Sequence, residues 1–177
     1  MPPEASLERA EHGLRPVSEG WFVVHARETR WFDSGELGRF GIFDSQEARF
    51  PQVGVGIGIL RPGEPNCMYH AEEMQEDFLV LSGECLLIIE GEERRLKQWD
   101  FVHCPPWTPH VFVGRGDGPC VVLAVGARRK GRGLLYPVDE TALRHGAGVE
   151  VETSDPDVAY AKYGERTPIP CPKELTR

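Results

Sequence analysis

The sequence of 177 residues lacks the long apolar runs and the cysteine pairs that mark several classes of protein. No apolar stretch approaches the ~20 residues that cross a bilayer, and no apolar signal core follows Met1. The 5 cysteines are an odd number without a CxxC pair, which disfavours a disulfide framework. We therefore expect a cytoplasmic protein with reduced thiols and no membrane partner.

Positive charge is also scarce. The chain has 20 Lys and Arg against 28 Asp and Glu, a formal net charge of −8, so we expect no nucleic-acid partner. The densest basic run, Ala-Arg-Arg-Lys-Gly-Arg at residues 127–132, is predicted to be a solvated loop rather than a binding patch. No serine lies in a GxSxG elbow, and the alternate glycines at 54, 56 and 58 lie within a strand pattern, which disfavours a nucleotide fingerprint.

Turn-forming residues are abundant instead. The 20 Gly and 15 Pro are too many for a helical bundle, and 40% hydrophobic residues indicate a globular chain. Residues 52–60 alternate strictly between glycine and branched residues, and residues 21–27 are also predicted to be a strand. We predict an all-β fold, with roughly nine or ten short antiparallel strands between residues 21 and 126.

The same patterns suggest three parts. Residues 1–20 are polar and are predicted to be a flexible arm, and residues 21–130 the β-barrel. Residues 131–177 are predicted to be a C-terminal extension that packs on the barrel or on a partner. Two short helices are expected in it, one capped by Asp139 and stopped by Gly146, and one over residues 154–164.

Candidate metal ligands cluster at the start of an apolar strand. His70 and Glu72 share one face of a strand because residues two apart point the same way, and Glu76 has the same parity. His110 would have to come from a separate strand. Imidazole and carboxylate ligands together suit Zn, Fe, Mn, Ni or Co, and an incomplete shell leaves positions for water or substrate.

Taken one by one, these residues are weak signals, and the acidic run Glu72-Glu73 with Glu76-Asp77 is equally consistent with a charged loop. Cys67 and Cys104 lie near the same stretch. Each is a candidate ligand or nucleophile, although packing is the more ordinary role for such cysteines.

Two stretches resemble the motifs of the cupin family. The first motif, roughly G-x5-H-x-H-x3,4-E-x6-G, is similar to the segment with Gly63, His70, Glu72, Glu76 and Gly83, with one extra residue before the histidine. The second, roughly G-x5-P-x-G-x2-H-x3-N, is similar to residues 99–114, where Pro105 and His110 match. The departures are Glu72 for the second histidine, Trp99 and Trp107 for two glycines, and Gly114 for the asparagine.

This resemblance, over residues ~50–126, implies a cupin double-stranded β-helix, or jelly roll, with the arm and the helical extension added to it. It implies a metal bound by His70, Glu72, Glu76 and His110. A shell with two carboxylates would favour Mn or Fe(II). Alternatively, Glu72 is a general base and three ligands remain; Gln75 is a lesser candidate ligand.

The expected function is that of a metal-dependent enzyme acting on a small polar metabolite, with oxygenase and isomerase or lyase chemistry both open. The alternative is a non-catalytic, metal-dependent module that binds or senses a small molecule. The resemblance also implies a homodimer.

Overall fold

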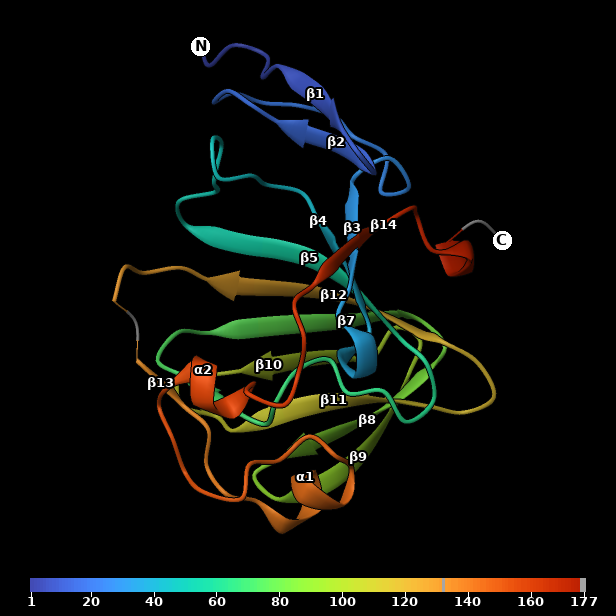
Figure 1. Ribbon diagram of the computed structural model, residues 1–177, viewed down its shortest axis with the longest axis vertical. Coiled ribbons are helices and arrows are strands. Elements are labelled where there is room, and N and C mark those ends of the chain that lie inside the picture. Colours follow the sequence, from blue (N-terminus) through green and yellow to red (C-terminus); the bar gives the residue numbers. More distant parts are fainter. Residues whose placement is uncertain (132, 176–177) are drawn as a thin grey trace.

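The computed structural model describes residues 1–131 and 133–175, and it is built almost entirely of antiparallel strands (Figure 1). A seven-stranded sheet has the order β10-β7-β12-β5-β4-β3-β14, and a three-stranded sheet has the order β11-β8-β9. Two further pairs are β1-β2 and β13-β6. The all-β prediction is confirmed. The strands are β1 (Leu7–Ala10), β2 (Gly13–Pro16), β3 (Arg30–Asp33), β4 (Arg39–Ile42), β5 (Val53–Leu60), β6 (Ala71–Glu72), β7 (Glu76–Ser82), β8 (Glu84–Ile89), β9 (Glu92–Lys97), β10 (Phe101–Cys104), β11 (His110–Arg115), β12 (Cys120–Ala127), β13 (Leu134–Leu135) and β14 (Thr167–Ile169).

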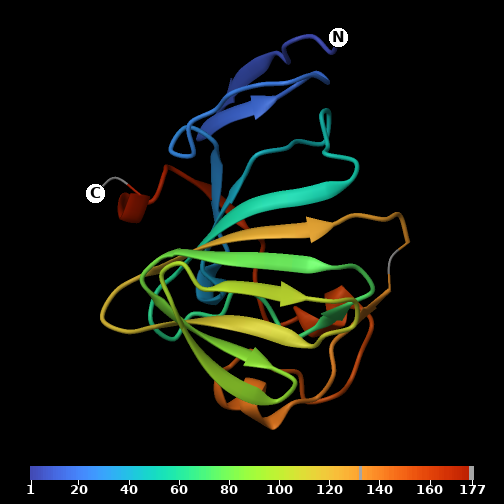
Figure 2. The same cartoon turned by 180° about the vertical axis from the view of Figure 1, so that it is seen from behind.

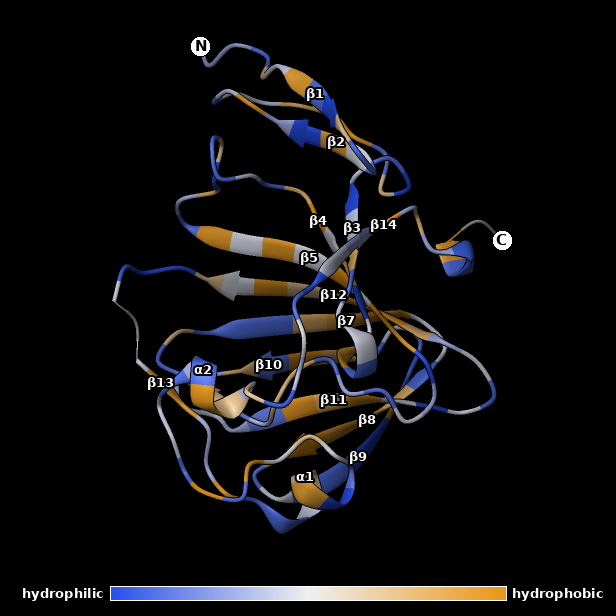
Figure 3. Cartoon of the chain, viewed as in Figure 1, coloured by the Kyte–Doolittle hydropathy of each residue, from blue (hydrophilic) through white to orange (hydrophobic). Residues whose placement is uncertain are grey.

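Strand β5 shows how the alternating pattern builds the barrel, and its two colours alternate in Figure 3. Its branched residues Ile57 and Ile59 pack outward with the fully buried Trp31. Gly56 and Gly58 face the other way, toward the core between the two sheets, so they leave space inside the barrel. The predicted period-two strand is confirmed, and the glycine face is the interior one.

Sharp turns lie at both ends of β8. Gly83 separates β7 from β8 with φ +73°, and Glu90 and Gly91 join β8 to β9 with φ 50° and 79°. Left-handed backbone at both central residues is the geometry that a tight hairpin needs.

The N-terminal region differs from its predicted form. Residues 21–27 are not a strand: Trp21 makes one isolated bridge with Glu4, and the chain then turns. Trp21 and Val23 are exposed, and no neighbouring strand continues the pairing. Residues expected to be an arm form the hairpin β1-β2, tied to the following segment by the hydrogen bond from Leu14 N to Glu28 O (2.6 Å).

The C-terminal extension follows the barrel surface. Helix α1 (Glu140–Arg144) is capped by Asp139 and α2 (Pro156–Ala159) by Asp155, so both predicted helices are confirmed. Single turns of 3-10 helix occur at Gly35–Leu37 and Lys173–Leu175. The extension joins the sheets twice, because β13 pairs with β6 and β14 with β3. The three proposed domain boundaries stay a prediction.

The N-terminal hairpin and part of the C-terminal extension lie far apart along the long axis. The hairpin β1-β2 lies at one end of it and α1 at the other, and β14 crosses the face seen in Figure 1. From behind, the strands of the large sheet are seen without that covering segment (Figure 2). None of the described helices has the length and apolar character to cross a membrane. The homodimer, the cytoplasmic location and the absence of a nucleic-acid partner stay predictions.

Candidate metal centre

The candidate site contains two histidines that are paired through their backbones. His70 directly precedes β6, His110 begins β11, and the two residues form an isolated antiparallel bridge. His70 N donates to His110 O (3.2 Å), and His110 N donates to His70 O (2.9 Å). Paired residues on antiparallel strands point to the same face, so both rings lie on one side, with centroids 5.1 Å apart.

Glu76 completes a compact group. It begins β7, and its Oε2 lies 3.5 Å from His70 Nε2 and 3.5 Å from His110 Nε2. One ligand atom from each of the three residues lies within 4.8 Å of the others, and this group could hold a metal ion. Ligand bonds of about 2.1 Å place neighbouring ligand atoms about 3.0–3.5 Å apart in an octahedral or tetrahedral shell. The observed 3.5 Å separations fit that spacing.

Both imidazoles present the same nitrogen to the group. His70 Nδ1 lies 2.9 Å from Met68 O, and His110 Nδ1 lies 2.9 Å from Thr108 O. A carbonyl oxygen only accepts, so each Nδ1 carries the proton and each Nε2 is left with a lone pair when the ring is neutral. Among the residues that the structure describes, the buried His110 Nε2 has no hydrogen-bond partner. A buried lone pair without a donor costs free energy, and a bound cation would satisfy it.

The electrostatics of the two histidines differ. Burial lowers the pKa of His110, and the neighbouring His70 lowers it further, so His110 favours the neutral form that ligates metals. Burial also pulls down the pKa of His70, but Cys67 and Glu76 beside the ring outweigh it and raise that pKa well above 6.5. An ion bound here would therefore have to displace a proton from His70.

Glu72 lies at the edge of the group. Its Oε1 is 3.9 Å from His70 Nε2, and the residue is 8% exposed. It does not belong to the set of three whose ligand atoms converge. Its backbone is held on both sides, since Glu72 pairs with Leu134 and its carbonyl accepts from Trp107 N (2.6 Å).

The lesser candidates lie elsewhere or serve other roles. The exposed Gln75 donates to Asp77 Oδ2 (2.5 Å), and Asp77 also pairs with His103 (2.6 Å) on the outside. Burial raises the pKa of the Cys104 thiol to about 12, so this core residue stays a thiol and packs. Cys67 is closer, with its Sγ 3.6 Å from His70 Nδ1.

Two residues that the motif analysis missed adjoin the site from the extension. Tyr136 is 3% exposed, and its ring centroid lies 6.1 Å from that of His70. The hydroxyl oxygen of Tyr160 accepts from Met68 N (3.1 Å), and burial raises its pKa. No sequence signal could place them, because Tyr136 reaches the site through the pairing of β13 with β6 and Tyr160 from the end of α2.

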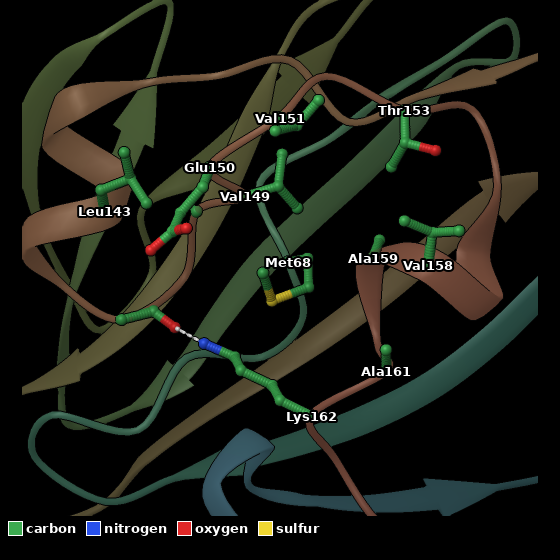
Figure 4. A pocket seen from close by; sticks show the side chains of 12 residues that line it. Met68, Leu143, Val149, Glu150, Val151, Thr153, Val158, Ala159, Ala161 and Lys162 are labelled. Carbon is green, nitrogen blue, oxygen red and sulfur yellow. Dashed lines mark hydrogen bonds between the residues drawn. The ribbon is translucent and has the colours of Figure 1, made fainter.

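Two hollows flank the site. One, of about 160 Å³, lies inside the barrel and has a mostly apolar lining that includes Gly56, Gly58, Phe78 and Phe112. Phe78 and Phe112 also face His110, with ring centroids 5.2 and 6.2 Å from it. The other, of about 450 Å³, lies in the extension, and Figure 4 shows its lining, with Met68 between α1 and α2. Met68 links this second hollow to the candidate metal centre, because it lines the hollow and its carbonyl accepts from His70 Nδ1.

The two tryptophans that stand in place of the motif glycines keep a glycine-like backbone. Trp99 has φ +74° and Trp107 has φ +66°. Trp107 also lies against Gly133 of the extension, where an added Cβ would be 2.6 Å from the ring. The positions thus retain the left-handed conformation that the motif's glycines would supply, although a side chain is present.

Replacing Trp99 with glycine is expected to raise the free energy of unfolding by up to about 1 kcal/mol, because glycine removes the cost of left-handed backbone. Trp99 is 67% exposed, so little packing is lost with its side chain. Urea unfolding of Trp99→Gly against the parent protein measures the change. Trp21→Gly is the control, since Trp21 is 53% exposed and has no positive φ. An equal gain in both variants would contradict the backbone explanation.

Fold and site together define a class of protein: an antiparallel double-stranded β-helix with histidines and a glutamate gathered in its barrel. Residues 56–126 match the cupin domain family, so the chain contains a cupin domain and the predicted jelly roll is confirmed. No curated protein matches the chain.

Solved structures show the same fold. The polyketide cyclase RemF from Streptomyces resistomycificus superposes with TM-score 0.54 at 16% identity, over 63% of this chain and 83% of that one. An RmlC-like cupin from Shewanella frigidimarina gives TM-score 0.51 at 15% identity, over 61% and 91%. A cupin-superfamily sugar phosphate isomerase from Silicibacter pomeroyi is 25% identical with TM-score 0.48. That match covers 52% of this chain and 65% of the other, less than two thirds of its length.

Proposed function

We propose that the protein binds a divalent metal ion through His70, Glu76 and His110 and uses it to act on a small molecule. The observation that carries this proposal is the buried Nε2 of His110, which has no hydrogen-bond partner in the described part of the chain and lies 3.5 Å from the Glu76 carboxylate. Two neutral imidazoles and one carboxylate form a donor set for Fe(II), Mn, Zn, Co or Ni. Such an ion would supply Lewis acidity or a site for O₂.

The chain's own residues suit a reaction that moves a proton. Glu72 lies beside the three ligands without joining them, and its carboxylate is within 3.9 Å of a ligand nitrogen. A carboxylate beside the ligand residues could accept a proton from a substrate held there. We therefore assign Glu72 the role of general base, and Met68 O and Thr108 O the role of orienting the two ligand rings.

The neighbouring cavity limits the substrate. At about 160 Å³ it admits only a small group, and Phe78, Phe112 and Val122 make much of its wall apolar. A metabolite that places a polar group on the ion and a short apolar part against these rings would satisfy both regions. The proposed substrate is therefore small and only partly polar. Isomerase or lyase chemistry would use Glu72 as the base. Oxygenase chemistry would use the same three metal ligands.

The alternative function is a metal-dependent binding or sensing module without catalysis. It gains support if Glu72 closes the shell as a fourth ligand. In a tetrahedral shell, four protein ligands leave no position for a substrate atom, whereas three protein ligands leave one.

Loading with Co(II) distinguishes these functions, because its visible spectrum reports coordination number and exchangeable ligands. We expect one equivalent of Co(II) with a five- or six-coordinate spectrum that changes on addition of azide. A tetrahedral spectrum insensitive to azide would support the non-catalytic module. Failure of the chelator-treated protein to take up any divalent ion would overturn the proposal.

A further inference from the structure

A basic pocket lies beside the barrel, apart from the proposed metal ligands. Its volume is about 450 Å³, and six residues line it: Arg49, Phe50, Pro51, Arg128, Arg129 and Lys130. Four of these six are cationic, in a chain whose net charge is −8. Such a concentration of positive charge against an acidic background is unusual for a surface loop, and it creates a local field that attracts anions.

Strand pairing brings the two halves of this pocket together. Ala127 at the end of β12 pairs with Val53 at the start of β5, so the residues just outside both strands become neighbours. Arg128 N then donates to Gln52 O (2.8 Å), which extends the contact past the sheet. Arg49 and Phe50 therefore face a run that lies about 80 residues further along the sequence.

Arg128 is the fixed member of the pocket. Its guanidinium donates to Asp44 Oδ2 (2.5 Å) and to Phe50 O (2.9 Å). It also lies over Gly54, where an added Cβ would be 3.1 Å from the guanidinium nitrogens. A guanidinium held on two sides is ordered before any ligand arrives, so less entropy is lost when it binds one.

The ion pairs leave two cations for a ligand. Arg128 pairs with Asp44, and Arg129 pairs with Glu73. Within residues 1–131 and 133–175, no ion pair involves Arg49 or Lys130. The pocket therefore carries an excess of about two positive charges, which matches a phosphate dianion.

We propose that this pocket binds a small phosphate ester. Arginine forks bind phosphate oxygens in pairs, and lysine binds them as a point charge, so the free cations and the held Arg128 suit a phosphoryl group. Phe50 supplies an apolar wall for the organic part, and it is backed by Phe22 at a ring-centroid distance of 6.1 Å. The volume is that of an ordinary metabolite site. Residues 128–130 of the basic run thus line a pocket, beyond the solvated loop expected from the sequence for 127–132, whose residue 132 lies outside the described residues.

Titration of the full chain with phenyl phosphate tests the site. Calorimetry measures the binding, in buffer that contains a metal chelator. We expect saturable 1:1 binding that weakens as salt rises, with inorganic phosphate binding more weakly because it lacks the contact with Phe50. The double variant Arg49→Gln with Lys130→Gln should weaken phenyl phosphate binding by at least about tenfold, the effect of losing one or two charge-assisted contacts.

The matched control removes the same charges elsewhere. Arg95→Gln with Lys97→Gln changes one arginine and one lysine on the exposed strand β9, and its binding should equal that of the parent protein. Absence of saturable binding in the parent, or equal loss in both double variants, would overturn the proposal. Thermal unfolding verifies that both variants fold. The chelator keeps the metal ligands empty, so failure of the proposed metal function would leave this result unchanged.

Discussion

Replacing Glu76 with glutamine should lower the affinity for a divalent ion by more than about 100-fold, beyond the loss usual for a residue that only orients a ligand. The Glu76 carboxylate is 3.5 Å from both ligand nitrogens, and it supplies the negative charge of the group. Glutamine has the same shape without the charge, so the fold should persist. Competition for Zn(II) and Mn(II) against a chromophoric chelator measures the affinity, and elemental analysis counts the ions bound.

The comparison with Glu72→Gln decides the role of the second carboxylate. Because Glu72 lies outside the convergent set, this variant should keep the ion within about tenfold of the parent affinity. His103→Gln is the control for a histidine outside the barrel, and its affinity should not change. If Glu72→Gln loses the ion as severely as Glu76→Gln, then Glu72 is a fourth ligand and is not the base.

Replacing Gly114 with alanine is expected to destabilise the protein by roughly 3–5 kcal/mol, a large part of the ~5–15 kcal/mol that holds a domain folded. An added Cβ would lie 2.1 Å from Arg61 O and 2.9 Å from Leu60 O. Both obstacles are backbone atoms, one in the last residue of β5 and one in the residue after it, so neither can rotate away. Relief would break the bonds from Gly63 N to Gly114 O (2.8 Å) and from Gly114 N to Glu64 O (2.9 Å).

Urea unfolding at constant pH measures this loss as a shift of the midpoint. Gly118→Ala makes the same chemical change in the turn that follows, where an added Cβ meets no atom within 4 Å. The control variant should unfold within about 0.5 kcal/mol of the parent protein. A similar midpoint for both variants would show that the strand at Gly114 can shift to admit a methyl group, and the predicted close approach would then be wrong.

Much of the fold follows from local rules that the sequence displays. The alternation in β5 predicted the strand because a pleated backbone has period two, whatever surrounds it. Gly63 and Gly83, placed by the motif spacing, adopt φ +85° and +73°, which glycine adopts without strain. The caps Asp139 and Asp155 accept backbone N–H groups at the starts of both short helices for an equally local reason.

Residues 21–27 show the limit of these rules. Their aromatic and branched residues suit a strand. A strand is stable only beside a partner strand, however, and that partner has to come from another part of the chain. In the folded protein, Trp21 finds a single bridging residue, so the segment remains irregular. Local composition therefore indicated a preference for strand, but no strand among the described residues pairs with this segment along its length.

The sequence by itself determined the class of fold, the turns and the kinds of ligand present, because periodicity and backbone preference act over a few residues. The tertiary structure alone decided which side chains meet. It separated Glu76, which converges with both histidines, from Glu72, which stands beside them, although both share one parity. It also joined Arg49 to the run at 128–130. Both outcomes depend on pairing between strands distant in sequence, and their register sets distances of a few ångströms that local patterns do not contain.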